Sequence, residues 1–271
     1  MDETMNIAML GCGKLGESLV KGWLDAGLFQ PSQIQATVRS VARAQEISSR
    51  LGFEVGTDNI RAVRDADVVV VGTKPQVVDQ VLDVVGDHLK SGALVISVAA
   101  GITIERMEAH LPEGVSVIRA MPNTPCLLGV GMTVVSPGAH TSAEQCTSAQ
   151  RLFAALGRAL ILDEKHMDGV TALSASGPAF MYVVIEALAE GGVAVGLPRD
   201  VATELAAQMA FGSASMVLET GSHPALLKDM VTTPAGCTID GILELEDGGL
   251  RVTLIKTIIQ TARRAAELAS S

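Results

Sequence analysis

Two stretches near opposite ends of the chain have residue types and spacings that suit anion binding. Residues 231–238 read VTTPAGCT. Thr233 before Pro234 is typical of a helix start, because a threonine side chain caps free backbone N–H groups and proline pre-sets the first turn. Small residues follow, and Thr238 adds a hydroxyl at the positive end of the helix dipole. The stretch predicts either an ordinary capped helix or a site for a small carboxylate.

The second stretch is a glycine-rich turn after the apolar run of residues 5–10. Its pattern is GxGxxG, and it consists of Gly11, Cys12, Gly13, Lys14, Leu15 and Gly16. In such a turn the first glycine permits the bend and the second lets the backbone approach a pyrophosphate, while the third lets helix and strand pack closely. An amphipathic segment continues to Leu24. This context predicts a dinucleotide site.

The next strand, residues 34–38, indicates which dinucleotide is bound. An NAD-binding chain usually has an acidic residue at this tip for the ribose hydroxyls. Here the strand ends in Arg39 and Ser40, and Arg43 lies one helical turn further on. Arginine pairs with a 2′-phosphate, so NADPH is favoured, with NADH as the alternative donor. The competing interpretation is that Arg39 is an ordinary solvated surface arginine.

Ligands of such sheets lie beyond the carboxyl ends of the strands, so three further loops are candidates for the cofactor site. One loop holds Gly72, Thr73, Lys74 and Pro75. In a second loop, Ala99 and Ala100 are small enough to admit a flat nicotinamide ring. A third loop offers Asn123, whose amide both donates and accepts hydrogen bonds. Lys74 is equally well interpreted as a phosphate contact or as a plain strand-end lysine.

The elements that must position these loops alternate between strand and helix. Residues 67–71 (DVVVV) are typical of a central parallel strand buried on both faces. Other predicted strands cover residues 53–55, 94–98, 115–118, 132–135 and 159–162, and predicted helices cover residues 41–51, 59–63, 77–89, 104–110 and 143–155. The alternation predicts an α/β domain, residues 1–166, with a doubly wound Rossmann-type sheet.

From residue 167 onward the strand signal gives way to helical spacing. Predicted helices cover residues 170–188, 199–218, 225–230, 238–246 and 249–268, with a turn expected at Gly191 and Gly192. Several of these helices are apolar around much of their circumference, which favours burial against a second copy of the chain. Residues 167–271 therefore form a predicted all-α dimerisation domain, in a homodimer at least and in a ring of dimers as the larger alternative.

Composition narrows the class of partner. A net charge of −10 argues against nucleic acid, which needs a basic face. The four cysteines show no CxxC spacing and the five histidines form no motif, so we predict no metal site and expect reduced thiols in the cytoplasm. The acidic N-terminus runs into a strand, unlike a targeting peptide. The uncharged stretch of residues 169–185 is shorter than a bilayer span and contains Pro178, so no membrane partner is expected.

Taken together, these motifs resemble the pyrroline-5-carboxylate reductases from about residue 5 to residue 268. The similarity is carried by GCGKLG, GTKPQ, SVAAGITI, MPNTP, ALSASGPAF, GLPRD and, most specifically, LKDMVTTPAGCTIDGILELE. The resemblance implies an NAD(P)H-dependent oxidoreductase that reduces 1-pyrroline-5-carboxylate to L-proline, the last step of proline biosynthesis. It also implies that the pyrroline lies between the nicotinamide and the loop before the Thr238 helix.

The resemblance implies roles for individual residues as well. Asn59 resembles the family's adenosine-side asparagine, and Glu164 resembles a residue near the substrate pocket. Residues of the VTTPAGCT stretch resemble the loop that holds the carboxylate and faces the ring nitrogen: Thr233, Gly236, Cys237 and Thr238. We take Thr238 as the catalytic residue, which hydrogen-bonds the ring nitrogen. The sequence departs from the family pattern at Ala175, Phe180, Met230 and Ala235.

The chemistry agrees with this interpretation, because a cyclic imine is easily protonated and its reduction needs positioning more than a strong acid. Two other functions remain as alternatives. A β-hydroxyacid dehydrogenase has the same two-domain plan but needs a catalytic lysine early in the helical part, and there is none between Lys165 and Lys228. A sensor that binds NADP(H) without turnover would not need an intact substrate loop.

Overall fold

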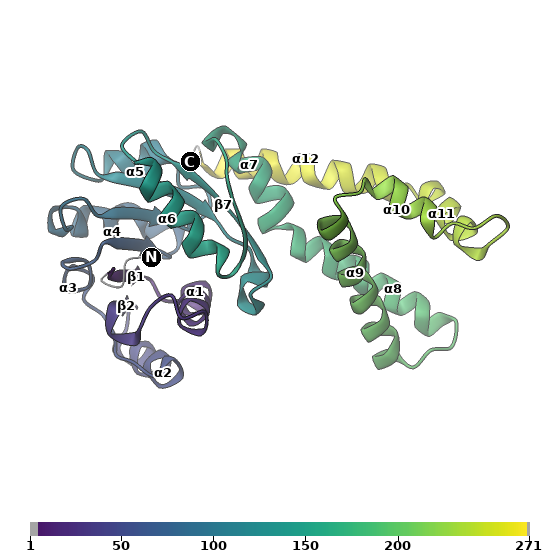
Figure 1. The fold of residues 1–271 in the computed structure, drawn as a ribbon, viewed down its shortest axis with the longest axis horizontal. Helices are drawn as coiled ribbons and strands as arrows, with labels where there is room; N and C mark the ends of the chain where they lie inside the picture. The colour runs from purple at the N-terminus through teal and green to yellow at the C-terminus, as the bar shows by residue number, and fades with distance from the viewer. Residues whose placement is uncertain (1–4, 270–271) are drawn as a thin grey trace. The chain divides into compact units, whose positions relative to one another are not determined.

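The computed structural model describes residues 5–269 and contains one eight-stranded sheet followed by helices (Figure 1). The strand order is β3-β2-β1-β4-β5-β6-β7-β8. Every neighbouring pair is parallel except β6 and β7, which are antiparallel. The strands are β1 (Ile7–Leu10), β2 (Ile34–Thr37), β3 (Val55–Gly56), β4 (Val68–Val71), β5 (Leu94–Ser97), β6 (Ser116–Met121), β7 (Gly131–Pro137) and β8 (Gly157–Ile161).

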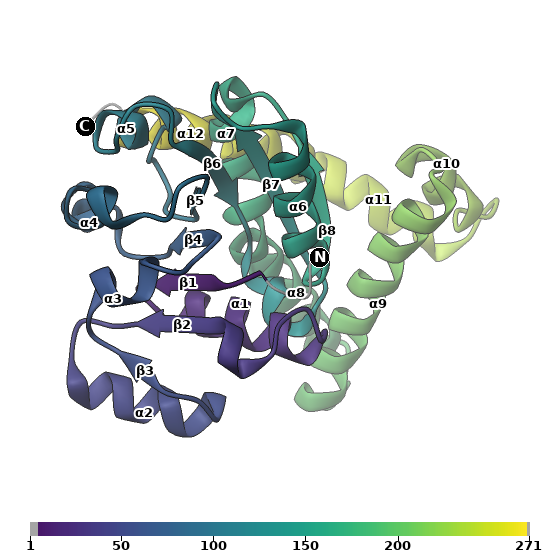
Figure 2. The ribbon, with the colours of Figure 1, turned by 60° about the vertical axis from the view of Figure 1, so that its left-hand side comes forward.

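Helices cover both faces of this sheet, as expected for a doubly wound fold (Figure 2). One face packs against α1 (Lys14–Asp25), α2 (Val41–Leu51) and α6 (Ala143–Ala154). The other face packs against α3 (Asn59–Val63), α4 (Val78–Val85) and α5 (Ile104–Ala109). Burial on both faces explains why β1 and β4 are apolar at every position.

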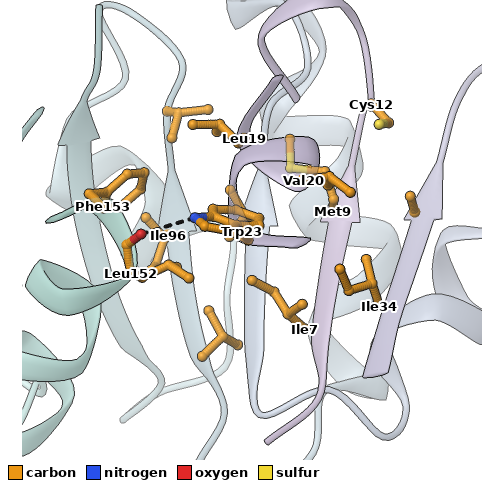
Figure 3. Close-up of a cluster of buried hydrophobic side chains, with 14 of the residues drawn as sticks. Ile7, Met9, Cys12, Leu19, Val20, Trp23, Ile34, Ile96, Leu152 and Phe153 are labelled. Atoms are coloured by element: carbon orange, nitrogen blue, oxygen red, sulfur yellow. Dashed lines mark hydrogen bonds between the residues drawn. The ribbon is translucent and has the colours of Figure 1, made fainter. Parts of the chain in front are cut away.

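Trp23 lies at the centre of the larger core cluster (Figure 3). Its ring is fully buried and packs edge-on against Phe29 and Phe153, with ring centroids 6.3 and 6.5 Å away. Its Nε1–H donates to the Leu152 carbonyl oxygen at 3.0 Å. This bond ties α1 to the end of α6, so a single side chain joins two helices on the same face of the sheet.

The rest of the chain is helical. After α7 (Met167–Val170) come one π-helical turn (Thr171–Ala175), α8 (Gly177–Ala194), α9 (Arg199–Thr220), α10 (Pro224–Met230), α11 (Cys237–Asp247) and α12 (Leu250–Ala269). Two compact units result: Met1–Ser176 with Thr261–Ser271, and Gly177–Gln260. The domain boundary predicted from the sequence lies earlier, after residue 166, because it marks the place where the predicted strands end.

The second unit has little core of its own. Its buried apolar residues, among those described, are Ala189, Ala202 and Ala206. Large apolar side chains of α8 and α9 are exposed, including Tyr182, Val183, Leu205, Met209, Phe211 and Leu218. By length and composition two helical segments, Glu164–Ala194 and Arg199–Thr220, are also sufficient to cross a bilayer. The uncharged stretch of residues 169–185 lies inside the first of these longer segments. The core helix of a soluble protein passes the same test, so the expectation of no membrane partner stays a prediction.

Most predicted helices and strands begin and end within two or three residues of the bounds in the structure, and the bounds of α2 and α3 match the prediction. The turn expected at Gly191 and Gly192 is wrong, because both glycines lie inside α8. A Cβ on Gly192 would lie 3.0 Å from the Ala202 Cβ, so this glycine allows α8 and α9 to pack closely. Its role is helix packing and not chain reversal.

We predict that Trp23→Phe lowers the free energy of unfolding by about 2 to 4 kcal/mol, because it leaves a void and removes the donor to the Leu152 carbonyl. Denaturant unfolding followed by circular dichroism measures the loss. Arg151→Lys, at an exposed position of α6, serves as the control and should change stability by less than about 0.5 kcal/mol. A loss for Trp23→Phe no larger than that of the control would contradict the role assigned to the indole.

Candidate functional site

The glycine turn has the geometry that a pyrophosphate site requires. Gly11 has φ +83°, and a Cβ there would lie 2.6 Å from Thr73 Cγ2. A Cβ on Gly16 would lie 3.0 Å from the Gly11 carbonyl oxygen. By contrast, a Cβ on Gly13 would meet nothing within 4 Å. The first and third glycines are thus required by packing, and the second faces open space.

Gly13 is also the N-cap of α1, and no side chain caps that helix. The first N–H groups of a helix have no partner within the helix, and their dipoles favour an anion. The three residues that follow, Lys14, Leu15 and Gly16, present these groups. The turn between β1 and α1 therefore fits a bound pyrophosphate.

Cys12 supports this turn without taking part in chemistry. Its side chain is buried, and its N–H donates to the Thr37 carbonyl oxygen at 2.7 Å. Burial is the main reason why the pKa of the Cys12 thiol rises to about 12. The thiol stays protonated at neutral pH, so it is neither a nucleophile nor a metal ligand here.

The tip of β2 presents one unpaired arginine. Arg39 is exposed and makes no ion pair with the described residues. From the sequence, Arg43 is expected to assist in binding a phosphate, but its guanidinium already forms ion pairs with the carboxylates of Glu17 and Glu46. The Ser40 hydroxyl accepts from the Arg43 N–H at 3.4 Å and caps α2. Arg39 remains the free cation at this strand end.

Asn59 and the loop after β4 lie at the same edge of the sheet, because Leu10 is in register with both Thr37 and Val71. The Thr37 hydroxyl donates to Asn59 Oδ1 at 2.6 Å, which leaves the Asn59 amide N–H groups without a described partner. Lys74 is exposed and makes no ion pair with the described residues. Among these residues, the buried Thr73 hydroxyl also lacks a hydrogen-bond partner. The loop of Gly72, Thr73, Lys74 and Pro75 thus offers unsatisfied polar groups to a ligand.

The loops after β5 and β6 differ in how many of their polar groups already have hydrogen-bond partners. Ala99 is buried and its N–H lies 3.2 Å from the Ser97 hydroxyl, while Ala100 is exposed. Asn123 Oδ1 accepts from the Met132 N–H at 2.8 Å, and Asn123 Nδ2 donates to the Ser174 carbonyl at 3.2 Å. The expected contact of Asn123 with the cofactor stays a prediction, but both ends of its amide already have partners in the protein.

Glu164 belongs to a buried ion pair that sequence reasoning missed. The Arg119 side chain is 4% exposed, and its Nη1 donates to Glu164 Oε1 at 3.1 Å. The same oxygen accepts from the Ile104 N–H at 2.9 Å. An arginine inside the strand sequence SVIRAM is the signal that should have predicted a buried acidic partner. Glu164 holds the end of the sheet unit together, and its role near substrate stays a prediction.

The loop before α11 is a turn and not the predicted helix start. The Gly236 N–H donates to the Thr233 carbonyl at 3.0 Å, which closes a four-residue turn around Pro234 and Ala235. Ala235 has φ +58° and is the one non-glycine residue with positive φ among residues 5–269. Proline second and positive φ third is the type II pattern. The interpretation of Thr233 and Pro234 as cap and first turn is therefore wrong, because the helix begins three residues later, at Cys237.

Gly236 is the N-cap of α11, again with no side-chain cap. A Cβ on Gly236 would lie 2.5 Å from Thr233 Oγ1, so the turn can close only on glycine. The uncapped N–H groups belong to Cys237 and Thr238, and Cys237 is exposed whereas Thr238 is partly buried. These backbone groups and the Thr238 hydroxyl are suited to bind a small carboxylate and a neighbouring polar atom.

Two glycine variants separate binding from folding at the first turn. Gly13→Ala should fold as the wild type, since its methyl group meets no protein atom, but should weaken NADPH binding by about tenfold or more because it occupies the approach to the N–H groups. Fluorescence titration and thermal unfolding measure the two effects. Gly11→Ala, at positive φ and against Thr73, should instead lose about 2 kcal/mol or more of stability. Wild-type NADPH affinity in Gly13→Ala would refute the pyrophosphate site.

Comparisons with known proteins point to one family. Residues 164–268 match the family described as pyrroline-5-carboxylate reductase dimerisation, and residues 6–101 match the family described as NADP oxidoreductase, coenzyme F420-dependent. A pyrroline-5-carboxylate reductase of Methanosarcina acetivorans is 41% identical over 266 residues, 98% of this chain and 98% of the relative.

Solved structures agree. The pyrroline-5-carboxylate reductase from Coxiella burnetii superposes with a TM-score of 0.91 at 33% identity, and covers 98% of each chain. The Plasmodium falciparum pyrroline carboxylate reductase, solved with NADP bound, has a TM-score of 0.88 at 26% identity and covers 98% of this chain and 99% of its own. With a relative 41% identical over almost the entire length of both chains, this chain belongs to the pyrroline-5-carboxylate reductase family.

Proposed function

We propose that this chain reduces 1-pyrroline-5-carboxylate to L-proline with NAD(P)H, the last step of proline biosynthesis. The observation that carries the proposal is a pair of helices, α1 and α11, that each start at an uncapped glycine. One glycine belongs to a dinucleotide turn and the other to a loop suited to a carboxylate. Two anionic ligands, a dinucleotide and a small amino-acid-like acid, match two such sites.

The cofactor residues lie on the sheet unit. The backbone of residues 11–16 holds the pyrophosphate, Asn59 lies toward the adenosine, and Lys74 adds a cation beside the phosphates. Residues 72–75, Ala99 and Ala100 line the edge beyond β4 and β5. NAD(P)H supplies the hydride for the imine carbon when it is bound.

The substrate residues come mainly from the turn before α11. The N–H groups of Cys237 and Thr238 bind the carboxylate. Gly236, whose own N–H donates to the Thr233 carbonyl, closes the turn that presents them. The Thr238 hydroxyl hydrogen-bonds the ring nitrogen. Glu164 keeps its second carboxylate oxygen, Oε2, available on the substrate side, because only Oε1 is bonded to Arg119 and Ile104.

No strong acid or base is required from the chain. The imine nitrogen of a pyrroline is protonated easily, and the carboxylate on the same ring offsets that charge. The chain therefore needs to fix the ring, keep its nitrogen hydrogen-bonded and present its carbon to the donor. A threonine hydroxyl is sufficient for the second task, because it both donates and accepts.

The partner is a second copy of the chain, in a homodimer at least and in a ring of dimers as the larger alternative. Three buried alanines are too little core for the second unit to be stable alone, and its exposed apolar side chains need a cover. Protein and not lipid is the proposed cover, because the acidic Glu186, Glu190 and Glu204 lie on the same two helices. The chain works in the cytoplasm, with no nucleic-acid partner.

Thr238→Ala tests the catalytic role. With NADPH saturating, kcat/KM for pyrroline-5-carboxylate should fall about a hundredfold, because one preorganised donor at the reacting group is lost. NADPH consumption and proline formation are both measured. Thr203→Ala, exposed on α9, is the matched control and should keep wild-type kinetics. If the two variants behave alike, Thr238 has no part in the reaction, and a wild-type protein that forms no proline would refute the function.

NADPH is the preferred donor, and the preference rests on Arg39. Arg39→Ala should lower kcat/KM for NADPH by about ten- to a hundredfold, since a charge-assisted bond to the 2′-phosphate is lost, and should leave kcat/KM for NADH within about twofold. Arg43→Ala should alter the ratio far less, because Glu17 and Glu46 already hold that side chain. A wild-type preference for NADH, or equal losses with both donors in Arg39→Ala, would overturn the assignment.

A further inference from the structure

Asn123 links two segments that lie 51 residues apart in the chain. Its Nδ2 donates to the Ser174 carbonyl oxygen at 3.2 Å and lies 3.5 Å from the Ser174 hydroxyl. Its Oδ1 accepts from the backbone N–H of Met132 at 2.8 Å. One amide thus joins the loop after β6, the start of β7 and the helical segment that contains Ser174.

The Ser174 carbonyl is free for this bond because of Pro178. In a regular helix that carbonyl would accept from the N–H four residues later, but residue 178 is a proline and has none. The proline ring also crowds the carbonyl four residues before it. The helix widens at this point into the π turn Thr171–Ala175, where the Ser176 N–H donates to the Thr171 carbonyl at 2.9 Å. The side chain of Asn123 replaces the donor that proline lacks.

Both ends of this link lie at functionally important places. Asn123 follows β6, whose carboxyl end adjoins that of β5 and the loop of Ala99 and Ala100, since Ser97 pairs with Arg119. Ser174 lies within the π turn Thr171–Ala175, two residues before Ser176, where this stretch of the first compact unit ends. Single π turns inside helices occur frequently at functional sites. The link therefore connects the loop at the carboxyl edge of the sheet with the π turn that precedes α8.

We propose that Asn123 is a positioning residue of the reductase, which joins the loop at the cofactor edge to the π turn and so holds that turn in place against the sheet. Its influence on the reaction is indirect, because its amide is bonded to Met132 and Ser174. Loss of the link loosens the π turn while the residues that bind the pyrophosphate and Arg39 stay in place. This inference rests on the proposed function, because its kinetic readout is the reduction of pyrroline-5-carboxylate.

Asn123→Asp and Asn123→Ala are compared. The carboxylate of Asn123→Asp still accepts from Met132 but cannot donate to the Ser174 carbonyl and places a negative charge beside it, whereas Asn123→Ala removes the link without adding charge. We expect kcat to fall by about ten- to a hundredfold, because a shift of the reactants by about 1 Å has an effect of this size. The Kd for NADPH should change less than about threefold. Ser174→Ala is the control, because it removes only the hydroxyl contact at 3.5 Å and keeps the carbonyl. An NADPH affinity that falls as much as kcat would overturn the proposal in favour of direct cofactor contact.

A double-mutant cycle tests the role of Pro178. In Pro178→Ala, the new N–H at residue 178 can satisfy the Ser174 carbonyl, so Asn123 is no longer needed there. Asn123→Ala should lower kcat about tenfold or more in the wild-type background and less than about threefold in the Pro178→Ala background. Equal factors in the two backgrounds would overturn the proposal, as would a Ser174→Ala variant that loses as much activity as Asn123→Asp.

Hydrogen exchange provides a readout that needs no substrate. In Asn123→Ala, the amide hydrogens of Met132 and Ser176 should exchange at least about tenfold faster than in the wild type, because their bonds depend on the link. The amide hydrogens of α9 should be unchanged. Faster exchange throughout the chain would mean general destabilisation and would contradict a positioning role. Because this arm is read without turnover, it judges the link even if the chain proves not to reduce pyrroline-5-carboxylate.

Discussion

A helix can bind an anion at its start only where no side chain of the protein already satisfies its first backbone N–H groups. Four helices, α2, α3, α5 and α6, begin with a Ser, Asp or Thr side chain that satisfies their first N–H groups. By contrast, α1 and α11 begin at Gly13 and Gly236 with no side-chain cap. The turn before each helix also contains a tightly packed glycine. Before α1 it is Gly11, which lies against Thr73, and before α11 it is Gly236 itself, which lies against Thr233. Helices α4, α7 and α9 also start without a side-chain cap, but their N-cap residues are Val77, His166 and Pro198 and not glycine. In the proposed function, the two glycine starts bind the two ligands.

Helices α1 and α11 belong to units whose apolar cores differ greatly in size. The sheet unit has two large apolar clusters and a buried Arg119–Glu164 pair, so its loops are held by a core of their own. The second unit buries only three alanines among its described residues. A turn as constrained as that around Ala235, with its positive φ, needs a rigid surround. The proposed second copy of the chain would provide that rigidity for this unit.

What the sequence predicts well is local. The GxGxxG turn and the alternation of strands and helices follow from sterics and periodicity within a few residues, and the structure confirms them. What it predicts poorly depends on distant partners. The pairing of Arg43 with Glu17, the bond from Asn123 to Ser174 and the packing of Gly192 against Ala202 all join residues far apart in sequence. The turn at Thr233 was mistaken for a helix cap because Thr-Pro suits both, and the bond from Gly236 decides between them.

A crystal structure of the protein with NADP⁺ and proline bound tests the central claim most directly. The pyrophosphate is expected on the backbone N–H groups of Lys14, Leu15 and Gly16, and the proline carboxylate on those of Cys237 and Thr238. The Thr238 hydroxyl is expected within hydrogen-bond distance of the proline nitrogen. A carboxylate held elsewhere, with the first N–H groups of α11 facing solvent, would contradict the account.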